Sequence, residues 1–210
     1  MARTQEPAVR LRLVEAAIRL FAEKGYESAS VSEIVAAAGV TKGSMYHYFQ
    51  SKDDLLLEIY QQVLAMQLDK LERLAAGPGT PVDRLRAVAV DVVVTTIEHL
   101  DATTVFFRSM HLLEPANWAA LRAQRRRYHE RFRALVEEGQ AIGLLRTDMS
   151  ADLAVHFFFG SVHHLQTWYR PDGPMNASQI GNVFGQLLID GLAPLPAADR
   201  TRTVSIPTGR

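Results

Sequence analysis

Apolar residues recur at the spacing of an α-helix along most of this chain, and no convincing run alternates apolar and polar residues as a half-buried strand does. In the first such stretch the apolar residues stand at positions i, i+3, i+4 and i+7, on one face of a helix: Val14, Ala17, Ile18 and Phe21. Gly25 follows as a residue that can end this helix. We therefore predict an all-α fold.

Residues that cap helices mark where the further helices begin. Ser30 and Glu33 form a capping box at the start of a second helix, which ends at Gly39, and Thr41 caps a third that runs to about residue 49. A long fourth helix is expected from about 51 to 75, before a Gly- and Pro-rich break at 77–81. The same signals predict later helices at about 81–100, 102–113, 116–141, 151–169 and 177–191.

The composition excludes several classes of protein. None of the 210 residues is cysteine, which excludes disulfides, thiolate metal sites and cysteine nucleophiles. The 23 basic residues balance the 23 acidic ones, so an argument for nucleic-acid binding must rest on a local site. No run approaches the roughly 18 apolar residues of a membrane span, and the first residues hold no apolar signal segment. We expect no membrane association and a cytoplasmic location.

Residues 30–52 have the pattern of a helix-turn-helix, in which two short helices are joined by a turn that contains Gly39. Met45 and Phe49 lie four residues apart and are expected to face inward, which leaves the start and outer sides of their helix open. Such a helix can enter the major groove of DNA, where small and polar residues reach base edges and hydroxyl and lysine groups reach phosphates.

We predict DNA contacts from the polar and small residues at these helix starts and outer sides: Ser30, Ser32, Thr41, Lys42, Gly43, Ser44, Tyr46, His47, Tyr48 and Lys52. The alternative is a helix-turn-helix with a purely structural role. With DNA as the partner, residues 7–55 form the DNA-binding domain, residues 56–192 a helical-bundle domain for ligand binding and dimerisation, and residues 193–210 a flexible tail.

A dimer is expected because one short recognition helix contacts too few base pairs to select a site in a genome. Two copies related by a two-fold axis double the specific contacts and require a near-palindromic double-stranded DNA operator. The last two helices are the candidates for the interface, where two glycines four residues apart would let another helix approach beside apolar residues: Gly181, Phe184, Gly185 and Leu188. The alternative for the two glycines is packing within one subunit.

Aromatic residues concentrate between residues 103 and 170, with polar groups between them, as in small-molecule sites between helices. Several arginines crowd the helix expected at 116–141, and arginine binds phosphates and carboxylates with two hydrogen bonds. We predict an effector site at Phe107, Arg108, His111, Arg125, Tyr128, His129, Phe159, His163 and Trp168. The alternatives are an ordinary aromatic core and a solvated arginine face.

The run from Gly39 to Lys52, after Phe21–Gly25 and Val31–Ile34, resembles the DNA-binding domain of TetR-family transcription regulators over about residues 8–55. Met45 stands where leucine is usual and Ser44 where threonine is common, and both substitutions keep size or chemistry. The resemblance implies an all-α homodimer with an N-terminal DNA reader and a C-terminal ligand-binding bundle. In this picture a ligand that prefers a non-binding conformation releases a repressor from its operator. Activation by the ligand is the alternative.

The segment Trp168–Pro174, with Ile180 and Gly181, is similar to the C-terminal half of TetR-family regulators of fatty-acid and sterol catabolism, several of which respond to acyl-CoA thioesters. The resemblance implies an amphiphilic small-molecule effector of the acyl-CoA class. A neutral or cationic drug-like hydrophobe is the competing effector.

A helical enzyme or a helical adaptor without DNA binding is the rival class. The sequence holds no His-Glu-x-x-His zinc motif, no Glu-x-x-His pair for a di-iron bundle, no phosphate-binding glycine loop and no Gly-x-Ser-x-Gly elbow. We therefore predict no catalytic residues, no metal and no cofactor.

Overall fold

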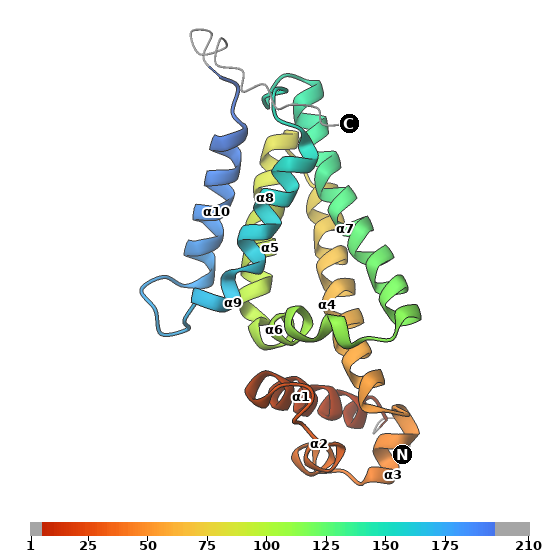
Figure 1. Cartoon of the computed structure of the whole chain (residues 1–210). Coiled ribbons are helices and arrows are strands. Elements are labelled where there is room, and N and C mark those ends of the chain that lie inside the picture. Colours follow the sequence, from red (N-terminus) through yellow and green to blue (C-terminus); the bar gives the residue numbers. More distant parts are fainter. Residues whose placement is uncertain (1–5, 196–210) are drawn as a thin grey trace. The chain divides into compact units, whose positions relative to one another are not determined.

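The computed structural model describes residues 6–195, and the tail expected at 193–210 lies outside the described residues from 196 onward. The elements, in chain order, are α1 (Glu6–Lys24), α2 (Val31–Ala38), α3 (Lys42–Tyr48), α4 (Lys52–Ala75), α5 (Pro81–Glu98), α6 (Leu100–Ser109), the 3-10 turn η2 (Met110–Leu112), α7 (Pro115–Ala141), α8 (Ala151–His163), α9 (Leu165–Trp168) and α10 (Ala177–Leu192) (Figure 1). No residue of this described part lies in a strand, so the all-α prediction is confirmed.

The capping side chains start the helices where the sequence places them. The Ser30 hydroxyl accepts from the Glu33 N–H while the Glu33 carboxylate accepts from the Ser30 N–H, which completes the capping box of α2. Asn176 and Gln179 form a capping box at the start of α10, and the Thr41 side chain caps α3 by accepting from the Ser44 N–H. Gly39 ends α2 with a φ of 64°, in the left-handed region that favours glycine.

Two helices end earlier than expected. The helix predicted at 102–113 ends at Ser109 and continues as the tighter turn η2. The helix predicted at 151–169 ends at His163, because the His164 N–H bonds to the Ser161 carbonyl three residues back, as in a 3-10 turn. Apolar periodicity does not register such breaks, since the backbone dihedrals stay close to helical.

Packing divides the described chain into two compact units. One holds the residues up to Asp69, Thr95–Tyr128 and Leu165–Tyr169, and the other holds Lys70–Val94, His129–His164 and the residues from Arg170 onward. The division cuts α4, α5 and α7, so it does not follow the boundary near residue 55 that we predicted from function. That boundary stays a prediction.

The first unit has a core that α3 shares with α1, α2, α4 and α6. Met45 and Phe49 are buried in one cluster with Phe21 and Ile34, as expected from their spacing. The cluster continues into α6, where Phe106 meets the Tyr60 ring edge-on with 4.8 Å between centroids. The seven-residue α3 is too short to be stable alone, so this core holds it in place.

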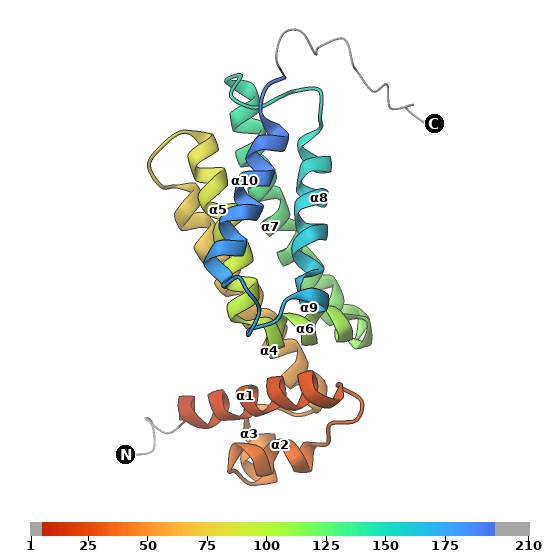
Figure 2. The ribbon, with the colours of Figure 1, turned by 90° about the vertical axis from the view of Figure 1, so that its left-hand side faces the viewer.

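The second unit packs α5, α8, α10 and the second half of α7 together, and α10 lies alongside α5 and α8 (Figure 2). Phe132 of α7 is fully buried and stacks on Phe158 of α8, with ring centroids 5.1 Å apart. None of the helices within residues 6–195 has the length and the apolar content that crossing a bilayer requires.

Candidate nucleic-acid interface

The outer side of α3 presents a compact polar surface. Tyr46 is 53% exposed, and Lys42, Gly43 and His47 are also exposed, whereas Met45 on the inner side has no exposed surface. The core packs against the inner side of α3 and holds this surface in place. Thr41 caps the N-terminus of the helix, where its Oγ1 accepts from the Ser44 N–H at 3.1 Å. A short helix fixed in this way offers its first turn to the major groove of DNA.

Gly43 is not required by the fold. A Cβ built on Gly43 meets only Thr41 Oγ1, at 3.7 Å, which is an ordinary van der Waals distance. The helix would also be more stable with alanine there, by about 1 kcal/mol. A glycine that packing does not need points to an external partner that approaches the backbone closely.

The other expected contact residues of α3 are less open. Ser44 and Tyr48 are half-buried, and the Tyr48 ring lies edge-on to His47 with centroids 4.9 Å apart. Their hydroxyls lie on the same seven-residue helix as the exposed residues. The structure therefore brings Thr41, Lys42, Gly43, Ser44, Tyr46, His47 and Tyr48 together in one segment.

The start of α2 is partly occupied by protein groups. Ser30 uses its N–H and its hydroxyl on the Glu33 carboxylate, which also forms an ion pair with Lys24. These bonds, first that from Lys24 and then those from Ser30, lower the pKa of Glu33 to about 2, so the carboxylate is charged at neutral pH. Ser32 is exposed. Of the two serines, Ser32 is therefore the one with a side chain open to a phosphate.

Lys52 departs from the expectation of a phosphate contact. Its ammonium donates to the carbonyls of Tyr26 at 2.8 Å and Ala29 at 3.0 Å, and it lies 4.2 Å from the centre of the Tyr26 ring. The Tyr26 hydroxyl in turn donates to Asp53, and burial, then this bond, raises the pKa of Tyr26. Lys52 thus ties the start of α4 to the loop after α1, and we leave it out of the DNA surface.

The expected effector residues fall into two clusters, one in each unit. In the first unit, Phe107 is half-buried beside Phe106, and the Arg125 guanidinium lies over the Phe106 ring, 5.3 Å from its centre. Tyr128 is buried, while Arg108, His111 and Trp168 are exposed. Buried Tyr128 and half-buried Phe107 and Arg125 are therefore the more enclosed of these six residues.

In the second unit, three of the expected effector residues meet. The His129 ring stacks on Phe159 with centroids 4.3 Å apart and an interplanar angle of 14°. The His163 ring lies 5.8 Å from Phe159. Phe159 is buried, and both histidines are half-buried. Within residues 6–195, no group of three or more histidine and acidic side chains is placed to hold a metal ion.

The two glycines expected at a subunit interface lie inside one subunit, which corrects that prediction. A Cβ on Gly185 would come within 2.9 Å of Val90 Cγ2, and one on Gly181 within 3.1 Å of the Val90 carbonyl. The close helix approach that these glycines allow is therefore with α5 of the same chain. Spacing alone showed that a helix packs there, but not which helix.

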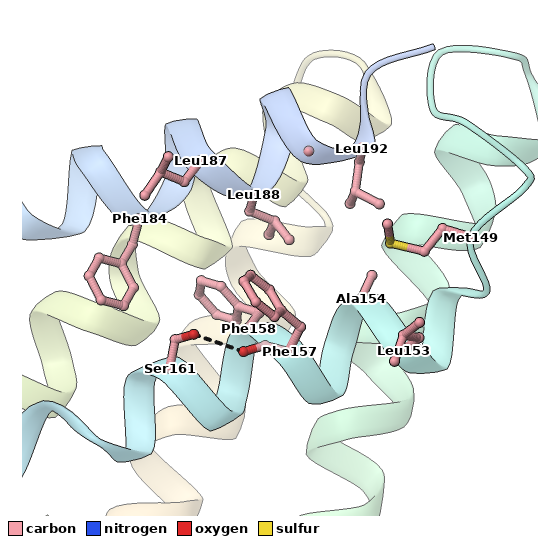
Figure 3. A pocket seen from close by; sticks show the side chains of 11 residues that line it. Met149, Leu153, Ala154, Phe157, Phe158, Ser161, Phe184, Leu187, Leu188 and Leu192 are labelled. Atoms are coloured by element: carbon pink, nitrogen blue, oxygen red, sulfur yellow. Dashed lines mark hydrogen bonds between the residues drawn. The ribbon is translucent and has the colours of Figure 1, made fainter. Parts of the chain in front are cut away.

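The opposite side of α10 is open and apolar (Figure 3). It forms a groove with α8, of about 530 Å³, which is lined by Met149, Leu153, Ala154, Phe157, Phe158, Ser161, Phe184, Leu187, Leu188, Gly191 and Leu192. Phe157 is 71% exposed and Leu187 64% exposed. The expected interface residues Phe184 and Leu188 line this groove, whereas Leu153 and Phe157 were not expected. The run Phe157–Phe159 was the available signal, because a helix cannot bury three consecutive side chains on one face.

Comparison with known proteins covers both parts of the chain. A model of bacterial regulatory proteins of the tetR family matches residues 13–59, and a model of the tetracyclin repressor-like C-terminal domain matches residues 78–192. The HTH-type transcriptional repressor KstR2 of Mycolicibacterium smegmatis is 24% identical over 191 residues, which are 90% of this chain and 93% of the relative.

Two further relatives bear on the choice between regulator and enzyme. The fatty acid metabolism regulator protein of Bacillus subtilis is 22% identical, over 87% of this chain and 94% of its own length. The crystal structure of AibR in complex with isovaleryl coenzyme A and operator DNA superposes with a TM-score of 0.77 at 26% identity, covering 86% of this chain and 98% of AibR. KstR2 and the Bacillus protein are named as regulators, not enzymes.

Proposed function

The chain belongs to the TetR family of bacterial regulatory proteins, and from this premise we propose that it is a homodimeric repressor that an amphiphilic small molecule releases from a palindromic operator. Its class is that of ligand-responsive, DNA-binding transcriptional regulators. We expect no catalytic activity, and a site of action in the cytoplasm, where the DNA is.

The exposed face of α3 carries the DNA-binding part of this proposal. Lys42, Gly43, Tyr46 and His47 are open while the inner side of the same helix is locked in the core. We assign direct DNA contacts to these residues with Thr41, Ser44 and Tyr48, and a phosphate contact to Ser32. The short helix explains why two copies are needed, since one recognition helix reads few base pairs.

The groove between α8 and α10 is the proposed subunit interface. Its exposed apolar residues, Leu153, Phe157 and Leu187, would leave water when a second copy packs on them in a two-fold arrangement. A large exposed apolar patch on a chain that otherwise buries its core is typical of such interfaces. The two-fold axis that this contact creates also supplies the symmetry that a palindromic operator requires.

An acyl-CoA thioester is the proposed effector. AibR, which this chain resembles along most of its length, is seen with isovaleryl coenzyme A. The aromatic residues of both clusters suit an apolar acyl group, and arginines suit an anionic head. Release requires only that the effector prefer a conformation whose two α3 helices do not fit the operator. Each 1.4 kcal/mol of that preference can lower the affinity for the operator up to tenfold.

Fluorescence polarisation on a labelled fragment from the promoter of the chain's own gene tests the proposal. We expect binding by two chains per palindrome, loss of binding in Tyr46→Ala with the fold intact, and release by long-chain acyl-CoA. Lys52→Ala is the informative comparison, because we expect it to act through the fold. Absence of binding at low salt would contradict the repressor function, and release by uncharged hydrophobes alone would favour the drug-like effector.

A further inference from the structure

The arginines of α7 differ in whether the protein neutralises them. Arg131 pairs with Glu72 at 2.9 Å and with Glu138 at 3.7 Å. Arg133 pairs with Asp152 at 3.1 Å and with Glu137 at 3.2 Å. Both belong to the second half of the helix, and their charges are balanced within the second unit.

Arg125, in the first half of α7, forms no ion pair with any carboxylate of residues 6–195, although it is half-buried. Its guanidinium lies over the Phe106 ring and donates to the Met110 sulfur at 3.7 Å, which is a weak acceptor. Removal from water, without a counter-charge, lowers the pKa of Arg125. A half-buried cation with these neighbours has hydrogen-bond donors to spare.

We propose that Arg125 binds the anionic oxygens of the effector's head group, a carboxylate or a phosphate. This assignment rests on the proposed function and adds to it the residue that recognises the effector's charge. The guanidinium presents a planar set of donors that matches two oxygens of one anion. Half-buried Phe107, Met110 and Trp118 pack against the same core and supply apolar surface beside the head. Arg122 stacks over Trp118 at 5.3 Å and places a second cation on α7 one turn before Arg125.

Phe106 links this anion site to the DNA-reading helices. Its ring lies under Arg125 and also meets Tyr60 of α4 edge-on, and the Tyr60 hydroxyl donates to the Val105 carbonyl at 3.2 Å. Phe106, Tyr60 and Met45 are buried in one cluster, and α6 packs directly against α1. An anion that draws the guanidinium off the ring therefore alters packing in the core that positions α3.

Three probes carry the same acyl chain and differ in their charged group. Decanoyl-CoA has phosphates, decanoate has a carboxylate, and decanoyl-pantetheine is uncharged. Binding to the full-length protein is measured by calorimetry, and operator release by fluorescence polarisation. The variants are Arg125→Gln and Arg125→Lys, and the matched control is Arg133→Gln, which removes a neutralised arginine of the same helix. Thermal unfolding checks that each variant is folded.

We expect Arg125→Gln to weaken binding of the anionic probes about tenfold to a hundredfold, because the variant loses a charge-assisted hydrogen bond. Binding of decanoyl-pantetheine should not change, Arg125→Lys should fall between, and Arg133→Gln should match the wild type. A loss of affinity in Arg125→Gln for decanoate alone assigns the site to carboxylates, and a loss for decanoyl-CoA alone assigns it to phosphates. A loss for both probes shows that the guanidinium accepts either anion.

Equal binding of charged and uncharged probes by the wild type, or unchanged binding by Arg125→Gln, overturns the inference. So does a wild-type protein that binds none of the three probes. In each of these cases operator binding, which is measured without any probe, still decides the DNA-binding function separately. The link through the ring is overturned if Phe106→Leu binds decanoyl-CoA and releases the operator as the wild type does.

Discussion

Replacing Leu187 with aspartate should separate the dimer without unfolding the subunit. Leu187 is 64% exposed in the single chain and lines the α8–α10 groove. Full burial of a leucine side chain is worth about 1.5–3 kcal/mol, so covering the exposed two-thirds contributes about 1–2 kcal/mol per copy. Two-fold symmetry doubles this to about 2–4 kcal/mol. The dissociation constant of the dimer should therefore rise by about 30-fold to several hundredfold, and a buried unpaired carboxylate raises it further.

Sedimentation over a range of protein concentrations measures this change directly. The matched control is Ile142→Asp, because Ile142 is 60% exposed in the same unit and does not line the groove. We expect the control to stay dimeric and Leu187→Asp to sediment as a folded monomer that binds the operator weakly. If both variants dimerise equally well, or if both dissociate, the groove is not the interface and the reasoning from its exposed apolar surface is refuted.

Three further changes test other parts of the structure. Gly43→Ala should leave the melting temperature unchanged or raise it, since helix propensity favours alanine by about 1 kcal/mol. The same variant should bind the operator more weakly in fluorescence polarisation. Unchanged binding would mean that no DNA group approaches this glycine closely. Gly185→Val should lower the free energy of unfolding by about 1–3 kcal/mol, because its Cβ would lie 2.9 Å from Val90 Cγ2. Denaturant titration measures this free energy. An unchanged value would contradict tight packing of Gly185 on α5 and favour its original assignment to the subunit interface. The pKa of Glu33 is about 2 against an ordinary 4.5, so its charged carboxylate stabilises the fold above pH 4.5, and this contribution disappears as the pH falls toward 2. The free energies of unfolding of Glu33→Gln and the wild type should therefore converge over that pH range. A difference that stays constant with pH would contradict this prediction.

The elements of this fold that local chemistry determines could be predicted from the sequence. The starts of α2, α3 and α10 follow from side chains that bond to backbone three residues later, as Ser30, Thr41 and Asn176 do. The inward direction of Met45 and Phe49 follows from helical spacing. The shape of the DNA-reading helix depends on these short-range interactions, which is why its place was predictable.

Partners that are distant in the sequence could not be predicted in the same way. Lys52 has the charge of a phosphate contact, but the carbonyls of Tyr26 and Ala29 meet its ammonium only once the chain has turned back on itself. The spacing of Gly181 and Gly185 shows that some helix comes close, yet it does not identify α5. Likewise, carboxylates of three different elements neutralise Arg131 and Arg133, and none among residues 6–195 pairs with Arg125.

The packing of α6 changes how an effector signal can reach the DNA-reading helices. Continuity of the chain suggests α4 as the lever, because it follows directly after the helix-turn-helix. However, α4 is divided between the two units at Asp69, whereas α6 lies wholly within the unit that holds α1, α2 and α3. Val105 and Phe106 are buried in the same cluster as Met45, so α6 moves only if that core repacks. A small shift at α6 is therefore transmitted by direct contact, and α4 needs only to follow it through the bond from Tyr60 to the Val105 carbonyl.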